Sequence, residues 1–162
     1  MQIAAILKKM IAYSEGNTHD INHLLKVWSY AKTIGELERL DEKTQRILET
    51  AAILHDIACP LCREKYGNTN GKYQEHEGMQ LAQEFLKDCG LSEYENERIV
   101  YLVGHHHTLS NIQGQDYQIL IEADYIANAD ESQYSQENIR NACERIFKTK
   151  SGTEILKSIY MV

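Results

Sequence analysis

The sequence has very little proline and few of the residues that mark turns between strands. Pro60 is the single proline among 162 residues, and only nine glycines occur. No long segment alternates between apolar and polar residues, as half-buried strands do. These absences predict an all-α protein, and the chain length predicts one domain over residues 1–162.

An excess of positive charge is also missing. Lysine and arginine together number 17, against 24 aspartates and glutamates, so the formal net charge is −7. Such a charge disfavours nonspecific binding to nucleic-acid polymers and to anionic membrane surfaces. A small phosphorylated ligand remains compatible with it, because a bound cation could meet the charge of the phosphate.

Long apolar runs and a secretory signal are absent as well. Residues 1–13 are partly apolar but contain Lys8 and Lys9, which predicts an amphipathic helix and no signal peptide or membrane span. Four cysteines without such a signal predict reduced thiols and a cytoplasmic location. Cys59 and Cys62 form half of a zinc motif, or a redox pair without its usual strand–helix context, and we interpret them as ordinary thiols.

Helical periodicity is the strongest local pattern in the chain. Two segments interrupt it and are predicted to be loops: residues 59–74, with the turn signal Asn70-Gly71, and residues 108–116. The predicted helices span residues 2–14, 19–37, 42–58, 75–88, 92–107, 117–130, 136–148 and 152–160.

Several ionisable residues fall on apolar helix faces. At helical spacing, His23 lies with Val27 and Ile34, while His55 and Asp124 lie among the apolar residues of two other helices. A single inward histidine is usually a core residue with a backbone or hydroxyl partner. Inward groups on three separate helices instead predict a shared metal ion, because buried charges need compensation.

The motifs around these residues occur in a recognisable order. They are His23-Leu-Leu-Lys26-Val27, then Ala51-Ala-Ile-Leu-His55-Asp56-Ile57, and finally Glu122-Ala123-Asp124-Tyr125-Ile126. Over about residues 18–130, this combination resembles the HD-domain phosphohydrolase family. Many members continue with Gly-Lys after His-Asp-Ile, whereas Ala58 and Cys59 stand here. The lysine that often lies near the phosphate is therefore absent from that position.

The resemblance implies a compact HD-domain helical bundle with a metal site in an interior cleft, followed by C-terminal helices within residues 135–160. The implied ligands of a divalent ion are His23, His55, Asp56 and Asp124. Imidazoles and carboxylates suit Mn²⁺, Fe²⁺, Co²⁺, Ni²⁺, Zn²⁺ or Mg²⁺. The implied activity is that of a phosphomonoesterase or phosphodiesterase on a small phosphoester such as a nucleotide, with metal-activated water as the nucleophile. Asp56 and Lys26 are the predicted catalytic residues.

A second histidine cluster follows the predicted helix 92–107. HD proteins with two metals use extra histidines in a similar order, so His105 and His106 are candidate ligands of a second ion. Gln74 occupies the position of a further expected histidine, so one ion is favoured and two are possible. Otherwise these histidines would face the phosphate. His19 and His107 are expected to be exposed or capping residues.

Substrate-binding candidates lie in the segment after the His-Asp motif. Arg63 and Lys65 are the cations expected to hold phosphate, with His76 as a further substrate-binding residue, although solvated loop charges are the alternative. A noncatalytic HD module, binding a nucleotide or a partner protein as a sensor, is the alternative function. The complete set of four ligands favours the enzyme. The sequence leaves the oligomeric state open.

Overall fold

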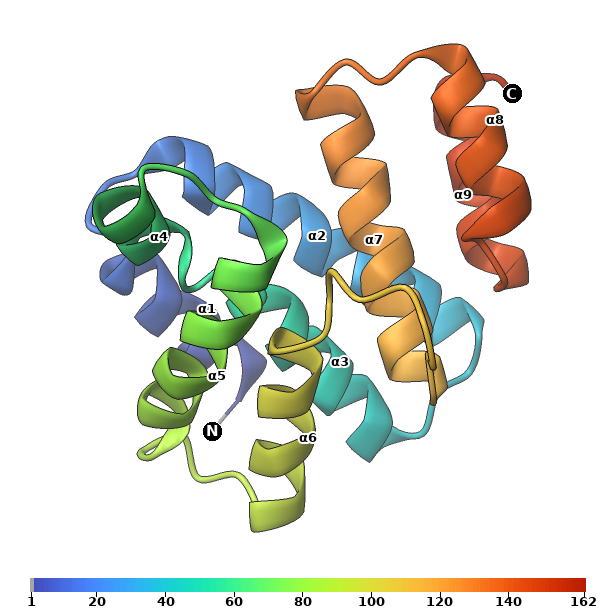
Figure 1. Ribbon diagram of the computed structural model, residues 1–162. Helices are drawn as coiled ribbons and strands as arrows, with labels where there is room; N and C mark the ends of the chain where they lie inside the picture. Colours follow the sequence, from blue (N-terminus) through green and yellow to red (C-terminus); the bar gives the residue numbers. More distant parts are fainter. Residues whose placement is uncertain (1) are drawn as a thin grey trace.

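The protein is helical throughout the part that the computed structural model describes, residues 2–162 (Figure 1). No strand occurs in this range, so the all-α prediction is confirmed. Among these residues, no helix combines the length and the apolar character that crossing a bilayer requires. Nine helices follow one another along residues 2–162: α1 (Ile3–Tyr13), α2 (Thr18–Leu37), α3 (Glu42–Leu54), α4 (Cys59–Tyr66), α5 (Gly71–Leu86), α6 (Glu93–Val103), α7 (Gln115–Glu131), α8 (Gln136–Arg145) and α9 (Lys150–Tyr160).

The segment 59–74, predicted to be a loop, contains a helix of its own. Helix α4 occupies residues 59–66, with Pro60 in its first turn, where the missing N–H of proline is not needed. Gly67 ends α4 with a φ of 71°, in the left-handed region that favours glycine. The turn signal Asn70-Gly71 is a helix start, because the Asn70 side chain accepts a hydrogen bond from the backbone N–H of Lys72.

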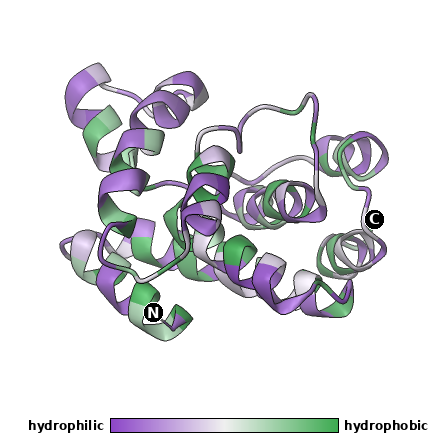
Figure 2. Ribbon diagram, turned by 90° about the horizontal axis from the view of Figure 1, so that it is seen from below, coloured by the Kyte–Doolittle hydropathy of each residue, from purple (hydrophilic) through white to green (hydrophobic). Residues whose placement is uncertain are grey.

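Helix α3 lies at the centre of the bundle. It packs against α1, α2, α6 and α7, and its Leu48, Ala51 and Leu54 are fully buried. In Figure 2, apolar and hydrophilic residues lie on opposite sides of several helices, as expected for helices packed around a core. The helix ends at Leu54, four residues earlier than predicted. His55 and Asp56 therefore stand on the turn that follows it.

The hairpin of α8 and α9 is attached to α7 by a buried glutamate. The Glu122 carboxylate accepts hydrogen bonds from Lys148 N at 2.7 Å, Thr149 N at 3.0 Å and Gln118 Nε2 at 2.7 Å. These donors satisfy a carboxylate that water does not reach. Since Glu122 precedes Asp124 by two residues, this anchor also supports the segment of α7 that carries a predicted ligand.

Candidate metal centre

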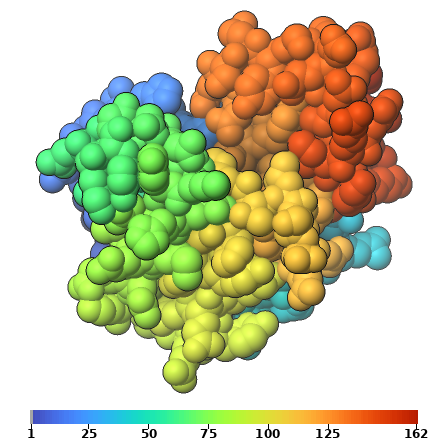
Figure 3. Space-filling model, in the orientation of Figure 1, coloured from blue at the N-terminus to red at the C-terminus, as the bar shows by residue number. Residues whose placement is uncertain are grey.

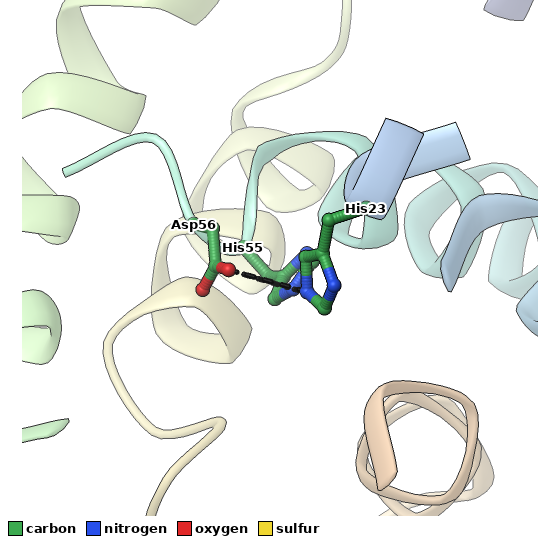
Figure 4. Close-up of side chains that lie close together, drawn as sticks. All are labelled: His23, His55 and Asp56. Atoms are coloured by element: carbon green, nitrogen blue, oxygen red, sulfur yellow. Dashed lines mark hydrogen bonds and ion pairs between the residues drawn. The ribbon is translucent and has the colours of Figure 1, made fainter. Parts of the chain in front are cut away.

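The four predicted ligands come together from three parts of the chain. His23 lies on the second turn of α2, His55 and Asp56 follow the end of α3, and Asp124 lies in the middle of α7. His23 Nε2 is 3.1 Å from His55 Nε2, 3.2 Å from Asp56 Oδ2 and 3.2 Å from Asp124 Oδ1. Figure 4 shows the His23 ring facing the Asp56 carboxylate, with His55 beside them. These contacts bring together His23, His55 and Asp124, which the helical phases had placed on inward faces, and Asp56 beside them.

The ionisable groups of this cluster lie close together, and three of the four are buried. His55 is 0% exposed, His23 6% and Asp124 7%. Burial by itself would lower the pKa of His23, but hydrogen bonds with Asp124 and Asp56 raise it to about 11. Burial would likewise raise the pKa of Asp124, yet His55 and His23 hold it well below its usual range. The two carboxylates thus require positive charge between them, from protons on the imidazoles or from a cation.

Hydrogen bonds behind the imidazoles determine which nitrogen each presents to the centre. His55 Nδ1 donates to the Ala52 carbonyl oxygen at 2.7 Å, and His106 Nδ1 donates to the Val103 carbonyl oxygen at 2.8 Å. His23 Nδ1 lies 2.7 Å from Glu131 Oε2. With Nδ1 occupied in this way, the Nε2 atoms are the nitrogens available for a metal, as in many metal-binding histidines.

A buried histidine nitrogen without a partner marks a second position. Among the described residues, His106 Nε2 is buried and makes no hydrogen bond, although it lies 3.4 Å from Asp56 Oδ1. An unpaired buried nitrogen is costly, and a cation would satisfy it. Asp56, His106 and His107 offer ligand atoms within 4.8 Å of one another, as do His23, His55 and Asp56. The residues therefore fit one or two metal ions that share Asp56.

The residues that could complete the second position include His107, whereas His105 lies apart from them. His105 Nδ1 bonds the Tyr101 carbonyl oxygen at 2.7 Å, and its ring stacks on Tyr101 with centroids 3.9 Å apart. His107 is exposed, as predicted, but lies beside Asp56. Helix α6 ends at Val103, so residues 104–107 form turns and helical spacing no longer predicts their directions. His105 was proposed from the order of histidines in HD proteins with two metals, and it lies outside both groups of candidate ligands in the described residues.

Residue 71 controls how closely α5 approaches this turn. A Cβ atom at Gly71 would lie 2.9 Å from the His107 ring, closer than packing allows. His107 Nε2 also lies 2.9 Å from Gln74 Oε1, on the same helix. The start of α5 therefore holds the His107 ring against Gln74.

A cavity of about 200 Å³ lies over the cluster. Figure 3 shows a hollow between the green atoms of α4 and α5 and the orange atoms of α7. Polar side chains from α2, α4, α5 and α7, and from the turns that follow α3, α4, α6 and α7, line it. They are His19, Asp20, His23, Asp56, Arg63, Thr69, Gln74, His107, Asp124, Asn128, Glu131 and Ser132, together with Cys59.

The sequence places this architecture within a known family. A family model described as HD domain matches residues 20–135. The chain belongs to the HD domain family. Its fold resembles the crystal structure of a predicted HD superfamily hydrolase from an uncultured Thermotogales bacterium, with a TM-score of 0.70 and 21% identity, covering 98% of this chain and 84% of that chain. No curated protein matches this sequence.

The part of the chain that matches the HD domain contains the whole histidine–aspartate cluster. Of the three predicted substrate-binding residues, one lines the cavity. Arg63 does so, and it donates to both oxygens of Asp20 at 2.7 and 2.8 Å. Lys65 instead pairs with Glu77, and His76 is exposed on α5, outside the cavity lining. Lys65 was predicted in a loop, but it lies on α4, where it faces Glu77. His76 lies on a helix as predicted, but its position on α5 places it outside the cavity lining.

Lys26 of this HD domain lies behind the ligands and does not line the cavity. Its ammonium is 3.2 Å from Glu131 Oε1 and 3.6 Å from Asp130 Oδ2. Since Glu131 also contacts His23, Lys26 acts on the centre through that carboxylate. The structure therefore gives Lys26 no direct contact with the cavity, contrary to its predicted catalytic role.

Two residues of α7 join the centre without having been predicted. Glu131 contacts His23, and Asn128 Nδ2 donates to Asp124 Oδ1 at 2.9 Å. Asn128 stands four residues after Asp124 and Glu131 seven residues after it, on the same face of the helix. That spacing from Asp124 is the sequence signal that could have identified them.

Cys59 and Cys62 are buried on α4, and Cys59 lines the cavity. Burial raises the pKa of both thiols, and the nearby Asp56 raises that of Cys59 further. Protonated, buried thiols react slowly. This agrees with their interpretation as ordinary thiols.

Proposed function

We propose that this HD domain is a metal-dependent phosphohydrolase acting on a small phosphoester such as a nucleotide. The observation that carries the proposal is the convergence of histidine Nε2 atoms and two ionised carboxylates on the floor of a polar cavity. A divalent ion in such a site lowers the pKa of water and polarises a phosphoryl oxygen. The fold shared with a predicted HD superfamily hydrolase supports the same reaction class.

The principal ion would be held by His23, His55, Asp56 and Asp124. Their imidazoles and carboxylates suit Mn²⁺, Fe²⁺, Co²⁺, Ni²⁺, Zn²⁺ or Mg²⁺. Asp56, His106 and His107 would hold a second, weaker ion, because they offer one shared carboxylate and a histidine that is exposed. The first ion would therefore be held tightly, and occupancy of the second position would depend on the metal concentration.

Asp56 is the proposed catalytic residue of the chain itself. Burial would raise the pKa of its carboxyl group, but His55, His106 and His23 hold that pKa well below its usual range. The carboxylate therefore accepts hydrogen bonds at neutral pH and can orient a water molecule toward a phosphorus atom. Glu131, paired with Lys26, would maintain the orientation of His23.

Asp56→Ala tests the assignment because Asp56 faces both candidate positions. We expect the purified variant to lose bound metal and to lose hydrolysis of p-nitrophenyl phosphate and of nucleotides, by about two orders of magnitude or more. Metal content is measured by elemental analysis, and turnover by product release. Lys65→Ala, on α4 but outside the cavity, serves as the control and should retain both.

Full metal content in Asp56→Ala would contradict the proposed ligand set. A metal-loaded wild-type protein that binds nucleotides without hydrolysing any phosphoester would contradict the enzyme and favour the noncatalytic sensor module.

A further inference from the structure

The one lysine or arginine among the described lining residues of the cavity is already paired with a carboxylate. Among the lining residues described, Arg63 is the sole lysine or arginine. Its guanidinium donates two parallel hydrogen bonds to Asp20, the strong bidentate geometry of an arginine–carboxylate pair. Asp20 also accepts from Asn17 Nδ2 at 3.0 Å, so the carboxylate is held from a second side. The pair therefore presents almost no net charge to a ligand.

Other cations on the neighbouring helices are directed away from the cavity. Lys26 pairs with Glu131 and Asp130, and Lys65 pairs with Glu77 at 2.5 Å. Neither lysine lines the cavity. A ligand must therefore rely on metal for most of the positive charge that it needs.

The charges around the cavity balance closely when metal is counted. One divalent ion offsets Asp56 and Asp124, Arg63 offsets Asp20, and Lys26 offsets Glu131. A second ion beside His106 would add two positive charges, which matches the charge of about −1.5 to −2 on one phosphate group. Each further phosphate adds negative charge, and among the described lining residues no further lysine or arginine offsets it.

The size of the cavity leads to the same restriction. Its volume is about 200 Å³, whereas sites for small molecules and cofactors commonly measure roughly 300–1,000 Å³. Proteins that bind nucleoside triphosphates use lysine, metal ions and loop amides to hold the β- and γ-phosphates. None of the described residues that line this cavity is a lysine.

We infer that the site selects esters that carry a single phosphate group and discriminates against di- and triphosphates, with Asp20 as a specificity-determining residue. The inference rests on the proposed phosphohydrolase function. Asp20 acts by withholding the Arg63 guanidinium from additional phosphate groups.

Metal-loaded wild-type protein tests the selectivity directly. The substrates are adenosine mono-, di- and triphosphate, p-nitrophenyl phosphate and bis(p-nitrophenyl) phosphate, with kcat/KM measured for each. We expect kcat/KM for the monophosphate to exceed that for the triphosphate by about 10-fold or more. The two nitrophenyl compounds distinguish a monoester from a diester within the single-phosphate class.

Asp20→Asn tests the cause of the selectivity. Loss of the carboxylate frees Arg63, so the monophosphate-to-triphosphate ratio of kcat/KM should fall by about 10-fold. Adding Arg63→Ala to this variant should restore the ratio. Glu77→Gln is the matched control, because it frees Lys65 on the same helix but outside the cavity, and it should leave the ratio unchanged.

The possible failures are distinguishable. No hydrolysis of any phosphoester by metal-loaded protein overturns the proposed function. Hydrolysis with equal or greater kcat/KM for the triphosphate overturns the selectivity while the proposed function stands. An unchanged ratio in Asp20→Asn overturns the role of Asp20.

Discussion

The partner of the Nδ1 atom differs among the histidines of the centre, and it decides whether that support can be removed by mutation. His55 and His106 are held by backbone carbonyls, which side-chain substitution leaves in place. His23 is held by the side chain of Glu131, which itself pairs with Lys26. Carboxylates behind metal-binding histidines orient the ring and increase its basicity. Glu131 is thus a positioning residue whose contribution can be removed by mutation.

Glu131→Ala should weaken metal binding by about 10- to 100-fold, because His23 loses the acceptor that orients its ring. Glu131→Gln keeps an acceptor oxygen but loses the charge, so its loss should be smaller. Both are measured by isothermal titration of Mn²⁺ into metal-free protein.

Asp130→Ala provides the control for Glu131. Asp130 also approaches Lys26, but its side chain is 67% exposed, and the His23 Nδ1 atom pairs with Glu131 instead. Its metal affinity should equal that of the wild type. Equal affinity in Glu131→Ala would show that His23 needs no such support.

At the scale of helices, the start of α6 joins a local cap to a tertiary contact. Ser92 Oγ accepts from Glu95 N, and Glu95 Oε2 accepts from Ser92 N at 2.9 Å, which completes a capping box. Glu95 Oε1 also accepts from Arg46 Nε of α3 at 2.6 Å. The buried Glu95 carboxylate therefore caps the start of α6 and attaches this helix to α3. The turn that carries His106 follows the other end of α6.

Glu95→Gln should lower the free energy of unfolding by about 1–3 kcal/mol at neutral pH. Burial would raise the pKa of Glu95, but Ser92 and Arg46 lower it from 4.5 to about 2. A pKa lowered by folding stabilises the protein above the unfolded pKa, and this stabilisation is lost as the pH falls through the folded pKa. The difference between the variant and the wild type should therefore shrink from about pH 4.5 toward pH 2, as measured by urea unfolding across that range.

Glu93→Gln is the control in the same turn. Glu93 lies in the first turn of α6 but is exposed and takes no part in the capping box. Its effect should remain within about 0.5 kcal/mol. A Glu95→Gln difference that stays constant down to the lowest pH would contradict the ionic role of Glu95.

On the scale of the molecule, the candidate metal centre joins elements far apart in the sequence. Ligand atoms come from α2, from the turns after α3 and α6, and from α7, while α3 packs against α2, α6 and α7. An ion that binds this arrangement binds the folded chain in preference to the unfolded one. Its binding should therefore stabilise the whole domain.

Saturating Mn²⁺ should raise Tm by about 5–10 °C, since a 100-fold excess over Kd contributes about 2.7 kcal/mol and each kcal/mol shifts Tm by about 2–4 °C. The raised pKa of His23 means that protons compete with the ion, so the shift should grow as pH rises. Thermal unfolding with Mn²⁺ or with a chelator measures it. An Asp56→Ala variant with the same shift would place the stabilising ion elsewhere.

Local sequence patterns were sufficient for the helical class and for the inward directions of His23, His55 and Asp124, whereas Asp56 was proposed from its place beside His55 in the motif. Scarce proline and glycine and the helical spacing of apolar residues predict most helices, because amphipathic faces are encoded by neighbours three and four positions apart. His23, His55 and Asp124 could be assigned inward directions because each lies within or immediately after a regular helix.

Only the tertiary structure decided the features that depend on breaks in helices and on distant partners. The choice of His107 over His105 follows the end of α6, after which side-chain directions lose helical spacing. The pairing of Arg63 with Asp20 joins α4 to α2, and that of Lys65 with Glu77 joins α4 to α5. Their positive charge and their position after the His-Asp motif made Arg63 and Lys65 candidates for phosphate binding. Their availability depends on which carboxylate the packed helices bring within hydrogen-bonding distance, and no local pattern encodes that distance.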